Sequence, residues 1–336
     1  MAKYNISGKA ILTDSDGTRD LIAESLTHTG TLTVTNTVKA LANDYFTNYF
    51  PQPYTFQGET SGYTSGGGNP SGGVNIIDKF SFATDGNATD VGDLSQARGF
   101  SAGQSSSTSG YTAGGGWPPT SQNTIDKFPF SSDANATDVG DLTQLRSMVV
   151  GQSSETNGYS SGGYVTGPYS NVIDKFPFSE DANATDVGDL GGTRYALAGQ
   201  SSTENGYISG EGVIEKFPFS TDTNSSDVGD LSHYERFGFG QSSTTHGYHS
   251  GGGSGINTIE NFPFSVDANS SDVGDLTVAR QRGAGQSSTA SGYSSAGYPP
   301  SLYGNTIDKF PFSSNANATD VGDLTTSRRE VTGQQV

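Results

Sequence analysis

The chain contains no cysteine, one tryptophan and only four histidines in 336 residues. The lack of cysteine excludes disulfides, thiolate metal sites and cysteine nucleophiles. Basic residues are also scarce, because 17 Lys and Arg stand against 35 Asp and Glu and give a formal net charge of −18. Phosphate binding depends on clustered Lys and Arg side chains, so a chain of this charge is not expected to bind nucleic acid.

Apolar residues make up only 31% of the chain. No apolar run approaches the roughly 20 residues that a membrane-spanning helix requires, so we expect no membrane insertion. The first residues lack the apolar stretch of a secretory signal, which favours a soluble protein made inside the cell. With 47 glycines, the composition is unsuited to one large core and suits several small sheets that each bury one strip.

Repetition is what the chain has in abundance. The sequence Asp-Val-Gly-Asp-Leu occurs six times, at spacings of 48, 48, 41, 45 and 48 residues. The copies begin at Asp90, Asp138, Asp186, Asp227, Asp272 and Asp320. A fixed period of this length indicates a repeat architecture, and it is the length of one β-propeller blade.

One repeat unit, residues 98–142, contains four short strand candidates separated by clusters of Gly, Ser, Asn and Pro. We name the strands a, b, c and d in chain order. Strand a ends at residues 102–106, strand b covers 110–115, strand c covers 123–130 and strand d covers 136–142. The unit therefore predicts a four-stranded antiparallel sheet.

The repeat resembles the kelch repeat. Kelch units end one strand with Gly-Gly, continue with a Val-Glu-Lys-Tyr-like strand and close with a turn that contains arginine. Here Gly114 and Gly115, then residues 125–128 (Ile-Asp-Lys-Phe), then residues 142–146 ending in Arg146, follow that order over roughly residues 57–336. The tryptophan usual in the fourth kelch strand is absent. The resemblance implies a divergent kelch-like propeller with a partner site on the face near its channel.

The ends of the repeat region predict a closed ring. A strand b at residues 61–67 has no strand a before it, and a strand a at 328–334 has no strand b after it. Joining the two completes a sixth blade and removes exposed sheet edges. We therefore predict an all-β fold in which a six-bladed propeller (residues 54–336) is closed by a C-terminal strand.

Residues 1–53 lie outside the repeat and are expected to form a small, mainly β attachment module and linker. Residues 31–35 alternate as in a strand, and residues 41–50 favour either a short helix or an aromatic linker. A unit this small buries little surface alone. We expect it to pack on the propeller, on copies of itself or on another protein.

Strand parity divides the loops between two faces of the ring. The a–b and c–d turns share one face and are nearly uniform, whereas the b–c and d–a loops share the other face and vary. Exposed aromatic and arginine residues are typical of binding hot spots. The candidate partner-binding residues on the variable face are Arg98, Arg146, Arg194, Arg280, Arg328, Trp117, Tyr164, Tyr169, Tyr298 and Tyr303, with Arg236 shifted by one position.

Two structural explanations for these residues stay open. The repeated arginine could instead hydrogen-bond carbonyls of the next blade or pair with carboxylates such as Asp141. The aromatic side chains could pack on neighbouring blades or on another copy of the chain.

Catalytic and metal sites are not expected. Carboxylates recur in every unit, whereas catalytic pairs usually break repeat symmetry, and no such break is evident. His246 and His249 are too few ligands for a metal site. Residues 133–138 alternate oxygen-bearing side chains as in a calcium loop, but they lack its glycine and late glutamate, so an Asx turn is the simpler explanation. We assign no catalytic residue and no cofactor.

The repeated sequence Phe-Pro-Phe-Ser-x-Asp-Ala-Asn-Ala-Thr-Asp-Val-Gly-Asp-Leu resembles repeats in virion structural proteins of tailed phages, including those of marine cyanobacteria. The resemblance implies a non-enzymatic structural or adhesive virion protein, made in the host cytoplasm and docked through its N-terminal module. Its expected partners are other virion proteins and a host surface glycan, in an oligomeric or assembly-bound state. The alternatives are a bacterial kelch-like adaptor that binds a protein and, less favoured, a glycan-processing enzyme.

Overall fold

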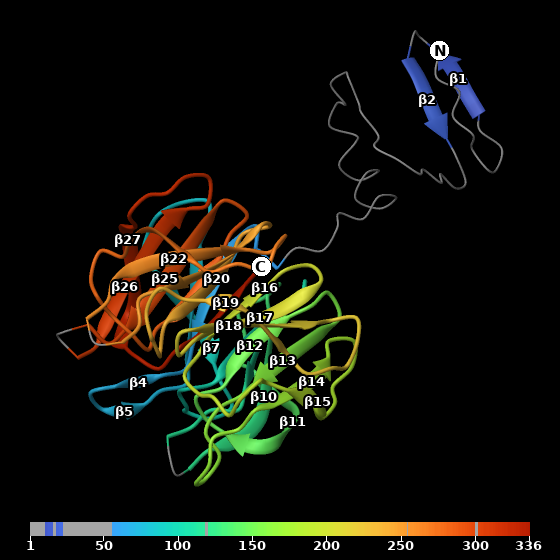
Figure 1. Ribbon diagram of the computed structural model, residues 1–336. Coiled ribbons are helices and arrows are strands. Elements are labelled where there is room, and N and C mark those ends of the chain that lie inside the picture. Colours follow the sequence, from blue (N-terminus) through green and yellow to red (C-terminus); the bar gives the residue numbers. More distant parts are fainter. Residues whose placement is uncertain (1–10, 16–17, 23–55, 118–119, 254, 300–301) are drawn as a thin grey trace. The chain divides into compact units, whose positions relative to one another are not determined.

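A computed structural model describes residues 11–15, 18–22 and 56–336, apart from 118–119, 254 and 300–301 (Figure 1). The chain divides into two units, Met1–Pro53 and Tyr54–Val336. In the first unit, β1 (Ile11–Ser15) pairs with β2 (Thr18–Ile22) as an antiparallel hairpin. The strand expected at 31–35 and the helix or linker expected at 41–50 lie outside the described residues.

The second unit is a six-bladed β-propeller of four-stranded antiparallel sheets, which confirms the predicted fold (Figure 1). Blade 1 contains β8 (Ala102–Ser105), β9 (Ser109–Ala113), β10 (Gln122–Pro129) and β11 (Thr137–Arg146). Blade 2 contains β12 (Val150–Ser153), β13 (Asn157–Ser161), β14 (Val172–Pro177) and β15 (Thr185–Asp189). Blade 3 contains β16 (Ala198–Ser201), β17 (Asn205–Gly210), β18 (Val213–Pro218) and β19 (Ser226–Asp230).

The remaining blades repeat this order with one exception, the last. Blade 4 contains β20 (Phe239–Ser242), β21 (His246–Ser250), β22 (Thr258–Pro263) and β23 (Ser271–Asp275). Blade 5 contains β24 (Ala284–Ser287), β25 (Ser291–Gly297), β26 (Gly304–Pro311) and β27 (Thr319–Arg328). Blade 6 contains β28 (Thr332–Gln335), β3 (Ser61–Ser65), β6 (Ile76–Ser81) and β7 (Thr89–Asp93), with a short hairpin of β4 (Gly68–Asn69) and β5 (Gly72–Gly73) in its b–c loop.

The ring closes at blade 6, where the C-terminal strand supplies the innermost position. Strand β28 pairs antiparallel with β3 and sets Gln334 opposite Tyr63. The carbonyl of Val336 accepts hydrogen bonds from the N–H groups of Thr60 and Ser61. The predicted seam between the two ends of the propeller is therefore confirmed.

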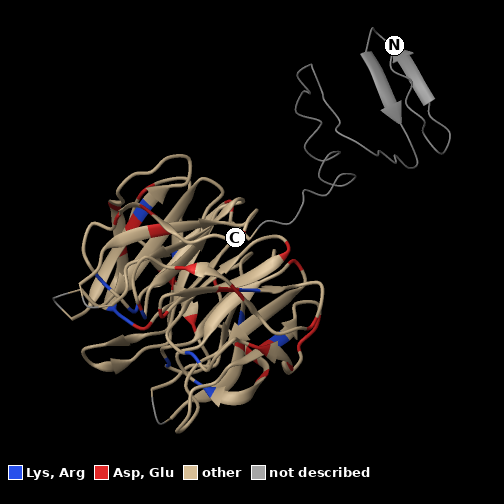
Figure 2. Cartoon of the chain, viewed as in Figure 1, with Lys and Arg blue, Asp and Glu red and all other residues tan. Residues whose placement is uncertain are grey.

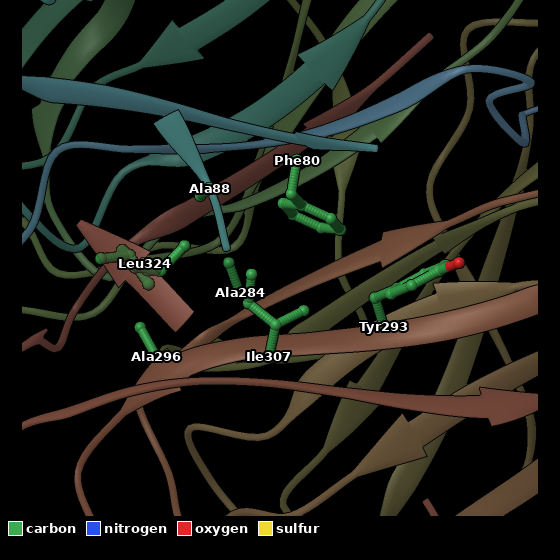
Figure 3. Packing of buried hydrophobic residues seen from close by; sticks show 8 residues of the cluster. Phe80, Ala88, Ala284, Tyr293, Ala296, Ile307 and Leu324 are labelled. Carbon is green, nitrogen blue, oxygen red and sulfur yellow. The ribbon is translucent and has the colours of Figure 1, made fainter. Parts of the chain in front are cut away.

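Small apolar clusters hold neighbouring blades together, as expected for a chain with few hydrophobic residues. One cluster between blades 5 and 6 combines Tyr293 and Ile307 with Phe80 and Leu324 (Figure 3). The ring of Tyr293 stacks on Phe82 with centroids 4.8 Å apart. The same contact recurs between the strand-b tyrosine and the Phe-Pro-Phe segment of the next blade, which explains why both are repeated.

A ring of buried glutamines links the innermost strands. The side-chain amide of Gln104 donates to the carbonyl of Tyr159 in the next blade at 2.8 Å. The equivalent bonds join Gln152 to Tyr207, Gln200 to Tyr248, Gln241 to Tyr293, Gln286 to Tyr63 and Gln334 to Tyr111. Because the six bonds close on themselves, each blade is fixed to its neighbour at the same height along the channel.

Glycine precedes each of these glutamines, where the innermost strands come closest. A Cβ atom on Gly151 would lie 2.1 Å from the carbonyl oxygen of Gly103, and Gly199 stands in the same relation to Gly151. This spacing requires glycine for steric reasons alone. The repeated Gly-Gln pair is thus the sequence signature of the channel wall.

Candidate binding face around the channel mouth

Four of the five predicted arginines are buried in the propeller. The side chains of Arg98, Arg146, Arg280 and Arg328 are at most 3% exposed. Each enters the following blade and donates to a strand-b carbonyl, as Arg146 does to Ser160. A surface partner cannot reach these side chains. The expectation that these four arginines are exposed on the variable face is therefore wrong.

A strand-c aspartate balances each buried arginine. Arg146 lies 2.7 Å from Asp174, and the guanidinium also donates to the carbonyls of Gly162 and Val172. The corresponding pairs are Arg98–Asp126, Arg280–Asp308 and Arg328–Asp78. Burial lowers the pKa of Arg146, and Asp174 acts in the opposite direction. The arginines thus bond to carbonyls as the structural alternative proposed, but their acidic partner is the strand-c residue and not Asp141 or its equivalents.

Arg194 is the exception among the five, because its side chain remains 20% exposed. Its Nε atom lies 2.9 Å from Glu215, and its Nη1 atom lies 3.3 Å from Glu211. Glu211 also pairs with Arg236, whose Nε atom lies 2.8 Å away. These two arginines and two glutamates form a charged cluster where blade 2 passes into blade 3 and blade 3 into blade 4.

Six residues in equivalent positions surround the mouth of the channel on the d–a side. They are Phe100, Met148, Ala196, Phe237, Arg282 and Glu330, and all have left-handed φ angles between 55° and 62°. In this conformation the N–H of Phe237 donates to the carbonyl of Ala196, and the N–H of Arg282 donates to that of Phe237. One backbone arrangement therefore carries six side chains of very different chemistry, of which Ala196 and Glu330 are buried.

Arginine side chains stack on aromatic rings around this mouth. The guanidinium of Arg282 lies 4.5 Å from the ring centroid of Phe237 and 5.7 Å from that of Phe100. Arg236 lies 4.4 Å from the ring of Tyr195. Stacked guanidinium groups keep their donors fixed, which favours them as preorganised binding groups.

The predicted aromatic residues fall into two groups on the same face. Tyr298 and Tyr303 flank Arg329, each with its ring centroid 4.9 Å from the guanidinium carbon. On the other side of the ring, Tyr169 stacks on Tyr195 at 4.2 Å, and Tyr164 lies 6.0 Å from Tyr169. These contacts bring the b–c loops beside the d–a loops, as strand parity predicts.

Trp117 belongs to the first of these groups. Its Nε1–H donates to Glu330 at 2.8 Å, and Glu330 also pairs with Arg282 at 3.0 Å. The indole ring rests against Gly73 of the β4–β5 hairpin, where a Cβ atom would lie 2.6 Å from it. Trp117 is thus held by contacts with blade 6 and with the d–a loop after blade 5.

Sequence reasoning missed several residues of this face, namely Tyr195, Phe237, Arg282 and Arg329 as binding groups. A signal for them exists in the sequence. The two positions that follow the repeated arginine differ in nearly every copy, although the residues around them are repeated. Variation confined to two positions of a uniform turn indicates that the shared blade fold does not require a particular side chain at these positions.

The repeat symmetry breaks between blades 3 and 4, contrary to the sequence expectation. Glu235 occupies the position of the buried arginine, two residues before Phe237, and it approaches the strand-c residue Glu260. Burial raises the pKa of Glu235, and the charge of Glu260 acts in the same direction. Glu260 keeps a lowered pKa, although burial opposes this, because Ser232 and Ser270 donate to its carboxylate.

His249 is buried beside this break, and its burial predicts that the free energy of unfolding depends on pH. Its Nδ1 atom lies 2.9 Å from the hydroxyl of Ser209, and burial lowers its pKa to about 4. On acidification the imidazole of His249 takes up a proton near pH 6.5 in the unfolded chain but only near pH 4 in the folded chain. The stability that depends on a neutral His249 is therefore complete above pH 6.5 and is lost as the pH falls towards 4. The free energy of unfolding should therefore drop by roughly 2 kcal/mol between about pH 7 and about pH 5 through this group.

His249→Ser is the matched variant, because blade 2 has Ser160 at the equivalent strand position. Urea unfolding at the two pH values measures the effect. The wild-type chain should lose more stability on acidification than the variant. Equal losses in both chains would contradict a neutral buried His249.

The opposite face carries repeated polar contacts between blades. Lys127 pairs with Asp181 at 2.9 Å, with equivalents at four other blade junctions. Within the loop that resembles a calcium site, Asn135 accepts the N–H of Asp93, and Asp138 accepts the N–H of Gly140 as an Asx turn. These oxygens thus bond within the propeller and join neighbouring blades (charged residues in Figure 2).

Within the residues that the structure describes, no three His, Asp or Glu side chains gather as potential metal ligands. The same residues include no helix long and apolar enough to cross a membrane.

The fold defines a six-bladed β-propeller whose stacked arginines and aromatic side chains gather around one mouth of its channel. Neither a protein-family model nor a curated protein matches the chain.

Proposed function

We propose that the chain is a non-enzymatic structural or adhesive protein of a tailed-phage virion. In this proposal the N-terminal unit docks to the particle, and the kelch-like propeller contacts another virion protein or a host surface glycan. One observation carries the binding role: six equivalent left-handed positions around the channel mouth hold six side chains chosen from five residue types. Uniform scaffolds with variable loops are typical of recognition surfaces.

The entry of the chain into the propeller supports this division of roles. The side chain of Gln57 donates to the carbonyl of Ser242, and the N–H of Gly58 donates to that of Ser287. Both acceptors lie at the ends of innermost strands beside the a–b turns. Gln57 and Gly58 thus lie on the uniform face, opposite the d–a loops.

The repeated sequence carries the virion context. Its resemblance to repeats of tailed-phage structural proteins agrees with an acidic, cysteine-free chain built of near-identical blades. High negative charge keeps copies soluble before assembly. A bacterial kelch-like adaptor that uses the same face to bind a protein is the alternative.

Phage particles that carry a variant of the full-length chain test the proposal. Arg236→Gln, Arg282→Gln and Arg329→Gln together remove the stacked guanidinium groups and keep a hydrogen-bonding side chain beside their glutamates. Such particles should contain the normal amount of the protein by immunoblot, while host adsorption falls about tenfold or more because hot-spot arginines are lost.

The matched control changes the opposite face. Lys175→Asn with Asp222→Asn copies a pair already present between blades 4 and 5, where Asn261 and Asn315 replace Lys and Asp. These particles should adsorb normally. Absence of the chain from purified particles would overturn the virion role, and capture of one bacterial protein that the triple variant loses would favour the adaptor.

A further inference from the structure

A cavity of about 260 Å³ opens on the variable face over blade 6. Its walls come from segments far apart in the sequence: Trp117 from blade 1, Tyr303 from blade 5, the β4–β5 hairpin of blade 6, and the d–a loop with Arg329 and Glu330. Among the strands of the described residues, the β4–β5 pair in the b–c loop of blade 6 forms a separate two-stranded sheet within the propeller. The cavity thus depends on features that the repeat itself does not supply.

Both aromatic walls of the cavity are fixed by neighbouring groups. Glycine at position 73 lets the indole of Trp117 lie directly on the backbone, and the hydrogen bond to Glu330 sets its rotation. Tyr303 stacks on Arg329, whose backbone pairs with Gly68 in both directions. Rigid walls lower the conformational-entropy cost of ligand binding.

Glu330, the acidic side chain in the cavity lining, pairs with Arg329 and with the neighbouring Arg282. Arg329 lies 3.3 Å from Glu330, and Glu330 is 4% exposed. An inorganic anion would have to compete with this carboxylate for the guanidinium. A purely apolar ligand would bury the guanidinium, the carboxylate and the Asn69 amide without hydrogen bonds, which is costly.

Vicinal hydroxyl groups fit this set best, because each can both donate and accept. Arg329 offers donors, Glu330 offers acceptors and Asn69 offers both. The C–H faces of a sugar ring are apolar and suit the flat faces of Trp117 and Tyr303. We propose that this cavity binds one saccharide unit of a glycan, an inference that rests on the proposed binding function and names its ligand class.

The chain reports on this site directly, because Trp117 is its only tryptophan. Full-length protein titrated with glucose, galactose, mannose, N-acetylglucosamine and oligosaccharides cut from the host surface polysaccharide should show a saturable change in tryptophan emission for at least one sugar. Sodium sulfate at the same concentration should give no saturable change in tryptophan emission.

Calorimetry with the sugar that binds then locates the site. Trp117→Ala and Tyr303→Ala should each weaken affinity about tenfold, the loss of one aromatic contact surface. Gly73→Ala should act similarly, because its Cβ atom would displace the indole while all cavity side chains remain. Tyr234→Ala is the control, since Tyr234 is an exposed tyrosine of a d–a loop that lies outside the cavity.

Three outcomes would overturn the inference: no saturable change with any saccharide, an equal response to sulfate, or an equal loss of affinity in the Tyr234→Ala control. Particles separate this result from the broader proposal. If Trp117→Ala particles adsorb normally while the triple arginine variant does not, the binding face stands and the saccharide site is wrong.

Discussion

Replacing Arg146 by alanine should lower the free energy of unfolding by about 3–5 kcal/mol, the usual cost of removing one partner of a buried ion pair. The change leaves the fully buried carboxyl group of Asp174 with the hydrogen bonds from Thr143 but without its cation. It also removes the hydrogen bonds from the guanidinium to the carbonyls of Gly162 and Val172, although Val172 still accepts one from the N–H of Gly162. Urea unfolding followed by circular dichroism measures the loss.

Arg236→Ala provides the control for exposure. Its side chain is 35% exposed and faces Glu211, so the loss should stay near 1 kcal/mol or less. A second variant, Arg146→Met with Asp174→Asn, removes both charges and should recover part of the stability that Arg146→Ala loses. Equal unfolding midpoints for Arg146→Ala and Arg236→Ala would contradict the clamping role of the buried arginines.

The blade count and the seam could be predicted because both depend on repetition. Each blade buries its strip only against the next, so the turn residues and the strand-c phenylalanines recur with every unit. Tyr63 marks a strand b without a strand a, and Gln334 marks the reverse, so their pairing followed from counting alone. No knowledge of side-chain packing was needed for this step.

The position of the arginines could not be predicted in the same way. A repeated arginine in a polar loop has the same sequence pattern whether it faces solvent or turns inward. The clue lay elsewhere, in Asp126 between the buried residues Ile125 and Phe128, because a carboxylate on a buried strand needs a cation. Sequence reasoning weighed each segment separately and did not connect this strand with the preceding loop.

Differences between copies would have been more informative than their shared residues. Between blades 4 and 5, Asn261 and Asn315 stand where the other junctions have lysine and aspartate, so both partners of one contact changed together. Between blades 3 and 4, the arginine becomes Glu235 and His249 appears in the adjacent strand. Paired changes of this kind identify residues in contact within a single sequence.

The channel wall offers a sharper test of how closely the blades pack. Gly151→Ala should destabilise the propeller by roughly 3 kcal/mol, at the upper end of the cost of overpacking. The new Cβ atom would lie 2.1 Å from the carbonyl oxygen of Gly103, which belongs to the backbone of the neighbouring innermost strand, β8. A side chain could rotate away from such a contact, whereas this carbonyl is held within a closed ring.

Gly86→Ala is the matched control, because a Cβ atom there would meet nothing within 4 Å. Thermal unfolding should show a clear fall in Tm for Gly151→Ala and almost none for Gly86→Ala. The clash with the carbonyl of Gly103 can be relieved only if the strand of Gly103 moves. The hydrogen bonds from Gln104 to Tyr159 and from Gln334 to Tyr111 oppose that movement. Equal melting of the two variants would mean that the six innermost strands stand further apart than these contacts require, and the repeated Gly-Gln pair would then need another cause.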